Sequence, residues 1–162
     1  MFDRVQVAAL QVYRRLPRPV RRLLVRGVSP SFTVGAICMI ERPDGAVLLV
    51  RQVYRNQWGV PGGLLKRGEE PADAARREVF EEVGLPIDLV GEPAVVVDAD
   101  PQRIDIVFRG RPAAGADHTA AAPCSPEIVE VDWFSADSLP QLQAEAAAAL
   151  VALARTSPLP HQ

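Results

Sequence analysis

The sequence predicts an α/β fold, because apolar runs typical of β-strands flank one short helix that carries most of the distinctive residues. Runs rich in β-branched residues occupy positions 32–40 and 47–53, and further strand candidates lie at 87–97, 104–109 and 128–134. The segment between the second and third runs has apolar residues at helical spacing. A chain of 162 residues with 48% hydrophobic content is ordinary for one globular domain.

Local signals set the expected bounds of these elements. Residues 42–45 read Arg-Pro-Asp-Gly, a strong turn signal, so the first two runs are interpreted as a β-hairpin. The helix is expected to begin at Pro71 and to end before Gly84, which suits the left-handed position after a helix. Residues 111–126 are expected to form an exposed loop, and residues 137–150 a further helix that is broken at Pro140.

Three glutamates stand close together on the short helix. Glu78, Glu81 and Glu82 lie within little more than one turn, and at about 100° per residue they share an arc of about 100°. Like charges this close repel each other, and carboxylate oxygens are ligands that suit Mg²⁺ or Mn²⁺. The cluster therefore favours a divalent metal site, with a plain solvated acidic face as the alternative.

Glycines and an arginine around these glutamates complete a longer pattern. Gly63 is followed after five residues by Glu69, and after seven more by Arg77-Glu78-Val79-Phe80-Glu81-Glu82-Val83-Gly84-Leu85. This spacing resembles the signature of the Nudix hydrolases, also called the MutT family, at every defined position. The resemblance implies an α/β/α sandwich with a mixed β-sheet. It also implies a divalent-metal-dependent pyrophosphohydrolase that cleaves a diphosphate linkage in a nucleoside diphosphate derivative.

The resemblance further implies which residues hold the metal. In the family, the glutamates that match Glu78 and Glu82 are the usual metal ligands, and the one that matches Glu81 assists as a ligand or as the base. Gly62 and Gly63 lack a Cβ atom, which suits a tight turn and a close approach of the backbone to a ligand. The Gly62 carbonyl is expected to complete the coordination of Mg²⁺, with Mn²⁺ as the alternative metal.

Two further roles follow from the same resemblance. The arginine that matches Arg77 tends to pair with the glutamate that matches Glu69 and to orient the helix. The catalytic base stays open between Glu81 in the signature and two carboxylates near the last predicted strand, Glu127 and Glu130. An undistorted strand does not point residues three apart to the same face, so at most one of that pair is expected at the site.

The substrate is less well defined by the sequence than the reaction. ADP-ribose and nucleoside triphosphates are the leading candidates. Pro101 lies 16 residues after Leu85, a spacing that resembles the ADP-ribose pyrophosphatase subgroup. Arg51, Arg55 and Arg103 are candidate ligands for phosphate.

Two other functions compete with hydrolysis. A non-catalytic, nucleotide-sensing module of the Nudix fold is one alternative, but it has no need of a repulsive carboxylate cluster. The isomerase branch of the superfamily, which acts on isopentenyl diphosphate, is the other. That branch requires a reactive cysteine, whereas Cys38 lies in an apolar run typical of a buried thiol.

Residues 1–30 lie outside the resemblance and differ in charge from the rest of the chain. They carry seven arginines and one acid, which gives +6, while the remaining 132 residues sum to −8. Apolar residues at Val5, Ala8 and Val12 predict an amphipathic helix, and residues 20–25 a second short one. The segment is interpreted as a helical layer packed on the domain, a homodimer contact, or a binding segment for acidic lipid or nucleic acid.

The chain is therefore divided into a basic helical extension (1–30), a Nudix hydrolase domain (31–156) and a flexible tail (157–162). No apolar run is long enough to span a membrane and no secretory signal is present, so a cytoplasmic location is expected. The expected partner is a small nucleotide-type substrate, and nucleic acid is not expected. With 17 Arg, one Lys and abundant Ala and Pro, the composition resembles that of proteins from high-GC bacteria.

Overall fold

The computed structural model describes residues 4–29 and 31–156, so the predicted tail at 157–162 lies outside the described residues. The chain divides into two compact units, of which the first ends at Phe32 and the second begins at Thr33. The first unit contains two helices, α1 (Arg4–Arg15) and α2 (Arg18–Val28). Within the described residues, no helix is both long enough and apolar enough to cross a membrane.

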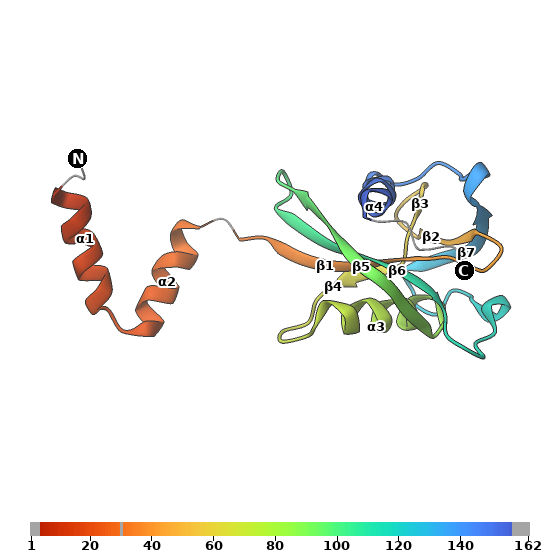
Figure 1. Ribbon diagram of the computed structural model, residues 1–162, viewed down its shortest axis with the longest axis horizontal. Coiled ribbons are helices and arrows are strands. Elements are labelled where there is room, and N and C mark those ends of the chain that lie inside the picture. The colour runs from red at the N-terminus through yellow and green to blue at the C-terminus, as the bar shows by residue number, and fades with distance from the viewer. Residues whose placement is uncertain (1–3, 30, 157–162) are drawn as a thin grey trace. The chain divides into compact units, whose positions relative to one another are not determined.

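The second unit is an α/β fold built on two β-sheets (Figure 1). Its elements in chain order are β1 (Thr33–Ile40), β2 (Ala46–Gln52), β3 (Trp58–Gly59), β4 (Gly62–Leu64), α3 (Pro71–Val83), β5 (Ile87–Asp98), β6 (Arg103–Pro112), η1 (His118–Ala120), β7 (Ile128–Ser135), η2 (Ala136–Ser138) and α4 (Ala144–Arg155). One sheet has the order β4-β1-β6-β5 and is mixed, because β1 pairs parallel with β6 and antiparallel with β4. The other, β3-β2-β7, is antiparallel. The predicted α/β class with a mixed sheet is confirmed.

Helices α3 and α4 lie on opposite sides of the sheets, which produces α/β/α layers (Figure 1). Alternation along β1 explains how one strand serves both layers. Ala36, Cys38 and Ile40 are buried in the cluster that includes the apolar residues of α3. Ile37 and Met39 are buried in the cluster that includes those of α4. A continuous apolar run is therefore what a strand covered on both faces requires.

The predicted hairpin is wrong in its pairing, although both strands and the turn between them are present. The Asp44 carboxylate accepts a hydrogen bond from the Ala46 N–H at 3.2 Å, and Gly45 has a φ of +82°. Beyond one bridge between Glu41 and Val47, however, β1 and β2 belong to different sheets. Each strand is central in its own sheet, with a neighbour on both edges, so the two diverge immediately after the turn.

Helix α3 begins and ends where the sequence predicts. Pro71 is its first residue, and Gly84 follows it in the left-handed conformation with a φ of 69°. The segment 111–126, predicted as an exposed loop, contains the short helix η1 and also contacts the end of α3. There the Cys124 N–H donates to the Glu82 carbonyl at 2.8 Å. The segment 111–126 therefore helps to hold the C-terminal end of the helix that carries the glutamates.

The helix predicted over residues 137–150 is displaced toward the C-terminus. A 3₁₀ turn, η2, covers its start, and α4 begins only at Ala144. The intervening backbone pairs instead with Trp58: the Trp58 N–H donates to the Gln141 carbonyl at 3.0 Å, and the Gln143 N–H donates to the Trp58 carbonyl at 2.8 Å. The interruption predicted at Pro140 is present, and the pairing with Trp58, which no local sequence pattern indicates, keeps residues 141–143 extended.

Candidate active site

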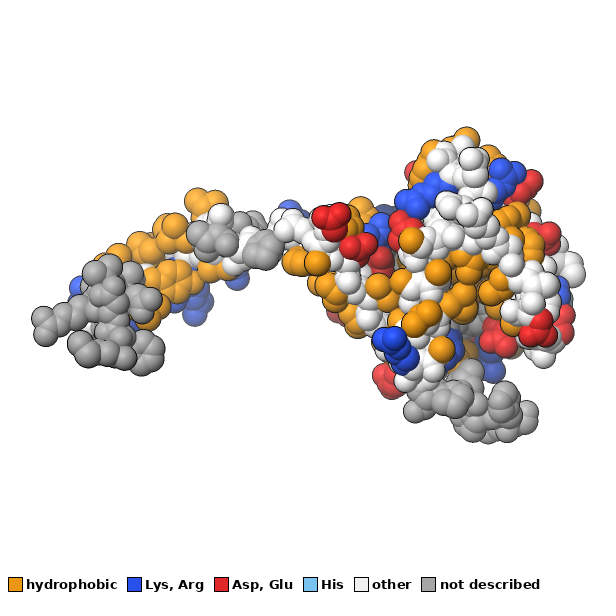
Figure 2. Space-filling model, turned by 90° about the horizontal axis from the view of Figure 1, so that it is seen from above, with side chains coloured by type: hydrophobic (Ala, Val, Ile, Leu, Met, Phe, Trp, Pro, Cys, Tyr) orange, Lys and Arg blue, Asp and Glu red, His pale blue; other side chains and the backbone are white. Residues whose placement is uncertain are grey.

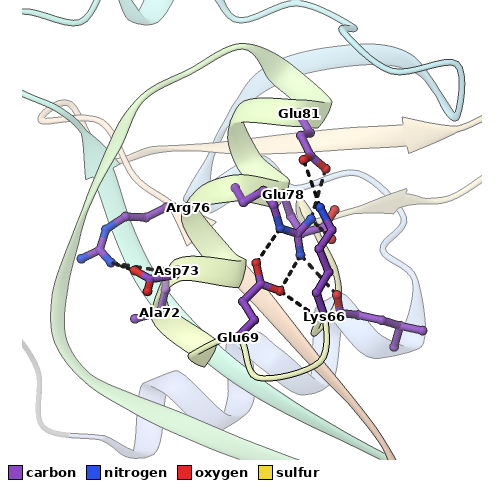
Figure 3. Close-up of polar contacts among 9 residues, drawn as sticks. Lys66, Glu69, Ala72, Asp73, Arg76, Glu78 and Glu81 are labelled. Atoms are coloured by element: carbon purple, nitrogen blue, oxygen red, sulfur yellow. Dashed lines mark hydrogen bonds and ion pairs between the residues drawn. The ribbon is translucent and has the colours of Figure 1, made fainter.

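Arg77 on α3 is the centre of the site, because its guanidinium group contacts three carboxylates. Its Nε and Nη2 atoms donate to the two oxygens of Glu69 at 2.7 and 2.9 Å. Its Nη1 atom donates to Glu78 at 2.6 Å and to Glu81 at 3.1 Å. Figure 3 shows the Glu69 side chain of the loop and the Glu81 side chain of the helix directed toward each other. One cation therefore holds three carboxylates that would otherwise repel each other.

Glu69 is fixed by the loop as well as by Arg77. The backbone N–H of Lys66 donates to the Glu69 carboxylate at 2.7 Å. The hydrogen bonds from Arg77, followed by the one from Lys66, lower the pKa of Glu69 to about 2. Glu69 therefore stays ionised, and the pair that the sequence predicts between Arg77 and Glu69 is in direct contact. This contact ties the loop before α3 to the helix itself.

Glu82 is the buried carboxylate of the site, with 7% of its surface exposed. The Gly62 N–H donates to its Oε2 atom at 3.0 Å. Burial raises the pKa of Glu82 to about 7, and repulsion from Glu78, Glu127 and Glu81 acts in the same direction against the Gly62 hydrogen bond. A carboxylate in this environment is stabilised in its charged form by a nearby cation.

The two glycines of β4 allow the backbone to lie against these carboxylates. A Cβ atom on Gly63 would lie 2.5 Å from the carboxyl carbon of Glu78. Gly62 has a φ of +153°, and a Cβ atom there would lie 2.5 Å from the carbonyl oxygen of Ala36. Neither position accepts a side chain without displacing its neighbours. The Gly62 and Gly63 backbone is therefore part of the wall beside Glu78 and Glu82.

The donor set fits a hard divalent cation. The Glu78, Glu81 and Glu82 carboxylates and the Gly62 carbonyl are all oxygen donors, which suit Mg²⁺ and Mn²⁺. Within residues 4–29 and 31–156, no three acidic, His or Cys side chains are grouped as a ready metal site. The contacts of Arg77 account for this, because Glu78 and Glu81 turn toward its guanidinium group. Arg77 contacts the Oε1 atom of Glu78, so a cation can bind the Oε2 atom while Arg77 keeps the side chain in place.

A cleft of about 430 Å³ opens beside Glu78 and Glu82. Its other lining residues are Ile37, Gln52, Tyr54, Arg55, Val60, Gly62, Gly63, Leu64, Arg103, Glu127, Gln143, Glu145 and Ala146. Two of them are arginines held by carboxylates. Arg55 donates to both oxygens of Glu145 at 3.2 and 3.1 Å, and the Arg103 Nε atom donates to both oxygens of buried Asp105 at 2.9 Å.

The structure separates the residues that the sequence offered as bases. Glu127 lines the cleft with Glu78 and Glu82, and the hydrogen bond from the Val53 N–H to its carbonyl, at 2.8 Å, fixes its position before β7. Glu130 does not line the cleft; it accepts a hydrogen bond from Arg51 at 2.7 Å, and Arg51 does not line the cleft either. Glu81 is half-exposed and contacts Lys66 and Arg77 instead.

Several cleft residues were not identified from the sequence. Gln143 is buried, and its Nε2 atom donates to the Gln57 carbonyl at 3.1 Å and to Gln52 at 3.4 Å. Glu145 and Asp105 hold the two arginines of the cleft. None of these residues belongs to a recognisable motif. Only the pairing of segments far apart in the chain brings them to the site.

The fold and the glutamate-bearing helix together define a family of enzymes. A model of the NUDIX domain matches residues 31–154, and the chain belongs to the Nudix family. The prediction of a Nudix hydrolase acting on phosphoric anhydrides is thereby confirmed.

Three similar proteins illustrate the relationship. A MutT-like protein of Streptomyces ambofaciens is 29% identical over 116 residues, which cover 72% of each chain. The 8-oxo-dGDP phosphatase NUDT18 of Homo sapiens is 32% identical over 130 residues, which cover 76% of this chain and 37% of the human protein. The crystal structure of an ADP-ribose pyrophosphatase from Streptococcus suis superposes with a TM-score of 0.58 at 25% identity, covering 79% of this chain and 96% of that one.

Replacement of Arg77 by lysine tests its position at the centre of the site. A lysine cannot donate to Glu69 through two fixed N–H groups while it also reaches Glu78 and Glu81. We expect Arg77→Lys to bind Mn²⁺ about 10–100-fold more weakly than the wild type in a calorimetric titration. Arg76→Lys is the matched control, because Arg76 is exposed and pairs with Asp73. Equal losses of Mn²⁺ affinity in the two variants would contradict the central role of Arg77 in the site.

The buried Glu82 predicts how stability depends on pH in metal-free protein. Because its pKa is about 7 in the folded state and 4.5 for an unperturbed glutamate, the folded state holds the extra proton between these limits. Stability should therefore fall as pH rises through this window, by up to about 3 kcal/mol. We expect Glu82→Gln to remove this fall in urea titrations with chelator present. Half-exposed Glu81→Gln is the control, and an unchanged slope in Glu82→Gln would contradict the prediction.

Proposed function

We propose that this chain is a divalent-metal-dependent pyrophosphohydrolase that cleaves a diphosphate linkage in a nucleoside diphosphate derivative. Mg²⁺ is the expected metal and Mn²⁺ the alternative. The observation that carries the proposal is the buried Glu82, which lies with Glu78 and Glu127 at one cleft. Such a cluster costs stability unless a cation neutralises it. We assign the activity to residues 31–156.

ADP-ribose is the first candidate substrate and nucleoside triphosphates are the second. The likeness to the Streptococcus suis ADP-ribose pyrophosphatase supports the first. The likeness to the human 8-oxo-dGDP phosphatase supports nucleotide derivatives with an altered base, so oxidised nucleotides belong in the same comparison. A homodimer remains a prediction.

Residues of the signature would bind the metal or position its ligands. Glu78, Glu81, Glu82 and the Gly62 carbonyl would bind the cation. Gly63 has no Cβ atom and so leaves room for the Glu78 carboxylate beside β4. When bound, the cation would neutralise the diphosphate, polarise phosphorus and lower the pKa of the attacking water. Arg77 contacts both Glu78 and Glu81, and so it would hold the two carboxylates on the same face of α3 before a cation binds.

Glu127 is our candidate for the group that accepts the proton of the attacking water. Of the three carboxylates offered by the sequence, it alone lines the cleft, whereas Glu81 contacts Lys66 and Arg77, and Glu130 contacts Arg51. In the reaction, the water oxygen bonds to phosphorus, its proton passes to the carboxylate, and the bond between phosphorus and the leaving phosphate oxygen breaks.

Arg103 is our candidate for binding the far phosphate. Its Nε atom is engaged by Asp105, so the guanidinium group is fixed at the cleft while its Nη groups take no part in that contact. Tyr54 and Arg55 line the same cleft, and Arg55 is held by Glu145. Arginines pre-positioned by carboxylates bind phosphate at a lower cost in side-chain entropy.

A hydrolysis screen tests the reaction class. We expect Mg²⁺-dependent cleavage of one member of a panel of ADP-ribose, NADH, dinucleoside polyphosphates, and ordinary and oxidised nucleoside triphosphates, with products separated by chromatography. Glu82→Gln should abolish the activity while the circular dichroism spectrum is retained. Ligand binding without cleavage across the panel would favour the alternative, a non-catalytic nucleotide-sensing module. Wild-type activity in Glu82→Gln would refute the metal assignment.

A pair of matched substitutions tests the proposed base. We expect Glu127→Gln to lower kcat by about 10²–10⁴-fold with little change in KM, because a general base acts in the transition state. Glu130→Gln removes an equal charge from the same strand region and should stay within about threefold of the wild type, since exposed ion pairs contribute little. Comparable losses in both variants, or a loss only in Glu130→Gln, would rule out Glu127 as the base.

A further inference from the structure

The proposed hydrolysis assigns no role to the first unit, whose charge is one-sided. Residues 4–29 contain seven arginines and no aspartate or glutamate. No acidic side chain within residues 4–29 is therefore available to neutralise these arginines. A charge excess of this kind favours an anionic partner.

Helix α2 carries three arginines on one face, where Val25 also lies, and two leucines on the other. At about 100° per residue, Arg18, Arg21 and Arg22 lie within an arc of about 100°, and Leu23 and Leu24 lie on the opposite side. The two leucines are 72% and 48% exposed. Figure 2 shows hydrophobic side chains gathered along one side of this unit and arginines along the other. The helix is therefore amphipathic, with an apolar face that none of the described residues of its own unit covers.

The arginines of α2 are also grouped in space. Arg18, Arg21 and Arg22 line a hollow of about 570 Å³ together with Tyr13 and Val25. The Arg21 guanidinium lies 5.8 Å from the centre of the Tyr13 ring. These arginines occupy the first turn and a half of α2, which has no side-chain cap. The positive end of the helix dipole therefore adds to the charge of the three side chains.

We propose that the first unit binds the surface of an anionic phospholipid bilayer. Helix α2 lies along the interface, with Leu23 and Leu24 toward the acyl chains and Arg18, Arg21 and Arg22 on the headgroup phosphates. Basic amphipathic helices bind membranes through this combination of apolar burial and attraction to anionic lipid. Helix α2 has 11 residues, which suits a position in the interface and is too short to cross the bilayer.

The apolar face decides between a bilayer and other anionic partners. Phosphates of a nucleic acid would satisfy the arginines but would leave Leu23 and Leu24 in water. Contact between the apolar faces of two copies would bury the leucines but would leave the arginines on the outer faces without an anionic partner. Only a surface that offers anionic groups and hydrocarbon at adjacent depths satisfies both faces of the helix.

Vesicle co-sedimentation of the full chain tests this proposal. We expect binding to vesicles of equal parts phosphatidylglycerol and phosphatidylcholine, no comparable binding to pure phosphatidylcholine, and weaker binding as salt is raised. Replacing Arg18, Arg21 and Arg22 with glutamine should weaken binding about 100-fold. Leu23→Gln combined with Leu24→Gln should weaken it at least about 10-fold. Glutamine has a good helix propensity, and circular dichroism checks that the helices persist.

A second triple variant provides the matched control. Arg67, Arg111 and Arg155 are exposed arginines of the second unit, and their replacement by glutamine removes the same charge. This control should bind vesicles like the wild type. Equal binding to both kinds of vesicle, equal losses in the two triple variants, or retention on duplex RNA without vesicle binding would each overturn the proposal. The proposal would also be overturned if the protein does not bind vesicles but self-associates, and the double leucine variant abolishes that self-association.

Discussion

The contact between Arg77 and three glutamates is the interaction on which the rest of the site depends. The guanidinium group joins Glu69 in the loop to Glu78 and Glu81 on α3. A planar cation with several fixed donors can serve three carboxylates at once, which a lysine ammonium cannot do with the same geometry. Glu69 is also held by the Lys66 backbone, so hydrogen bonds through its carboxylate join the loop to the helix.

The same cluster shows that the site is arranged for charge and not for stability. Glu82 is buried near Glu78 and Glu127 with one backbone hydrogen bond, and burial raises its pKa to about 7. A fold selected only for stability would place an apolar side chain there. Burial of the apolar clusters on both faces of β1 offsets the free-energy cost of burying this carboxylate. The family assignment agrees with this interpretation, because a hydrolase of phosphoric anhydrides must stabilise concentrated negative charge.

Local sequence signals were most informative where the structure depends on neighbouring residues. The bounds of α3 follow from Pro71 and Gly84, whose backbone preferences act within one turn. Strand positions were likewise predicted, because continuous apolar runs indicate strands covered on both faces. The pairing of β1 with β2 was predicted wrongly, since a turn signal shows that the chain reverses and not which sheet each strand joins. The start of α4 was missed because Trp58 pairs with the preceding backbone.

The sequence by itself determined the family, the metal-suited glutamates and the helix that carries them, because all of these lie within 23 consecutive residues at helical spacing. It also determined the one-sided charge of the first unit. Only the tertiary structure distinguished Glu127, which lines the cleft, from Glu130, which pairs with Arg51. Only the tertiary structure joined Arg103 to Asp105 beside that cleft. The physical reason is that a helix fixes the relative positions of its own side chains, whereas the walls of a cleft come from strands and loops whose neighbours are set by the packing of the whole domain.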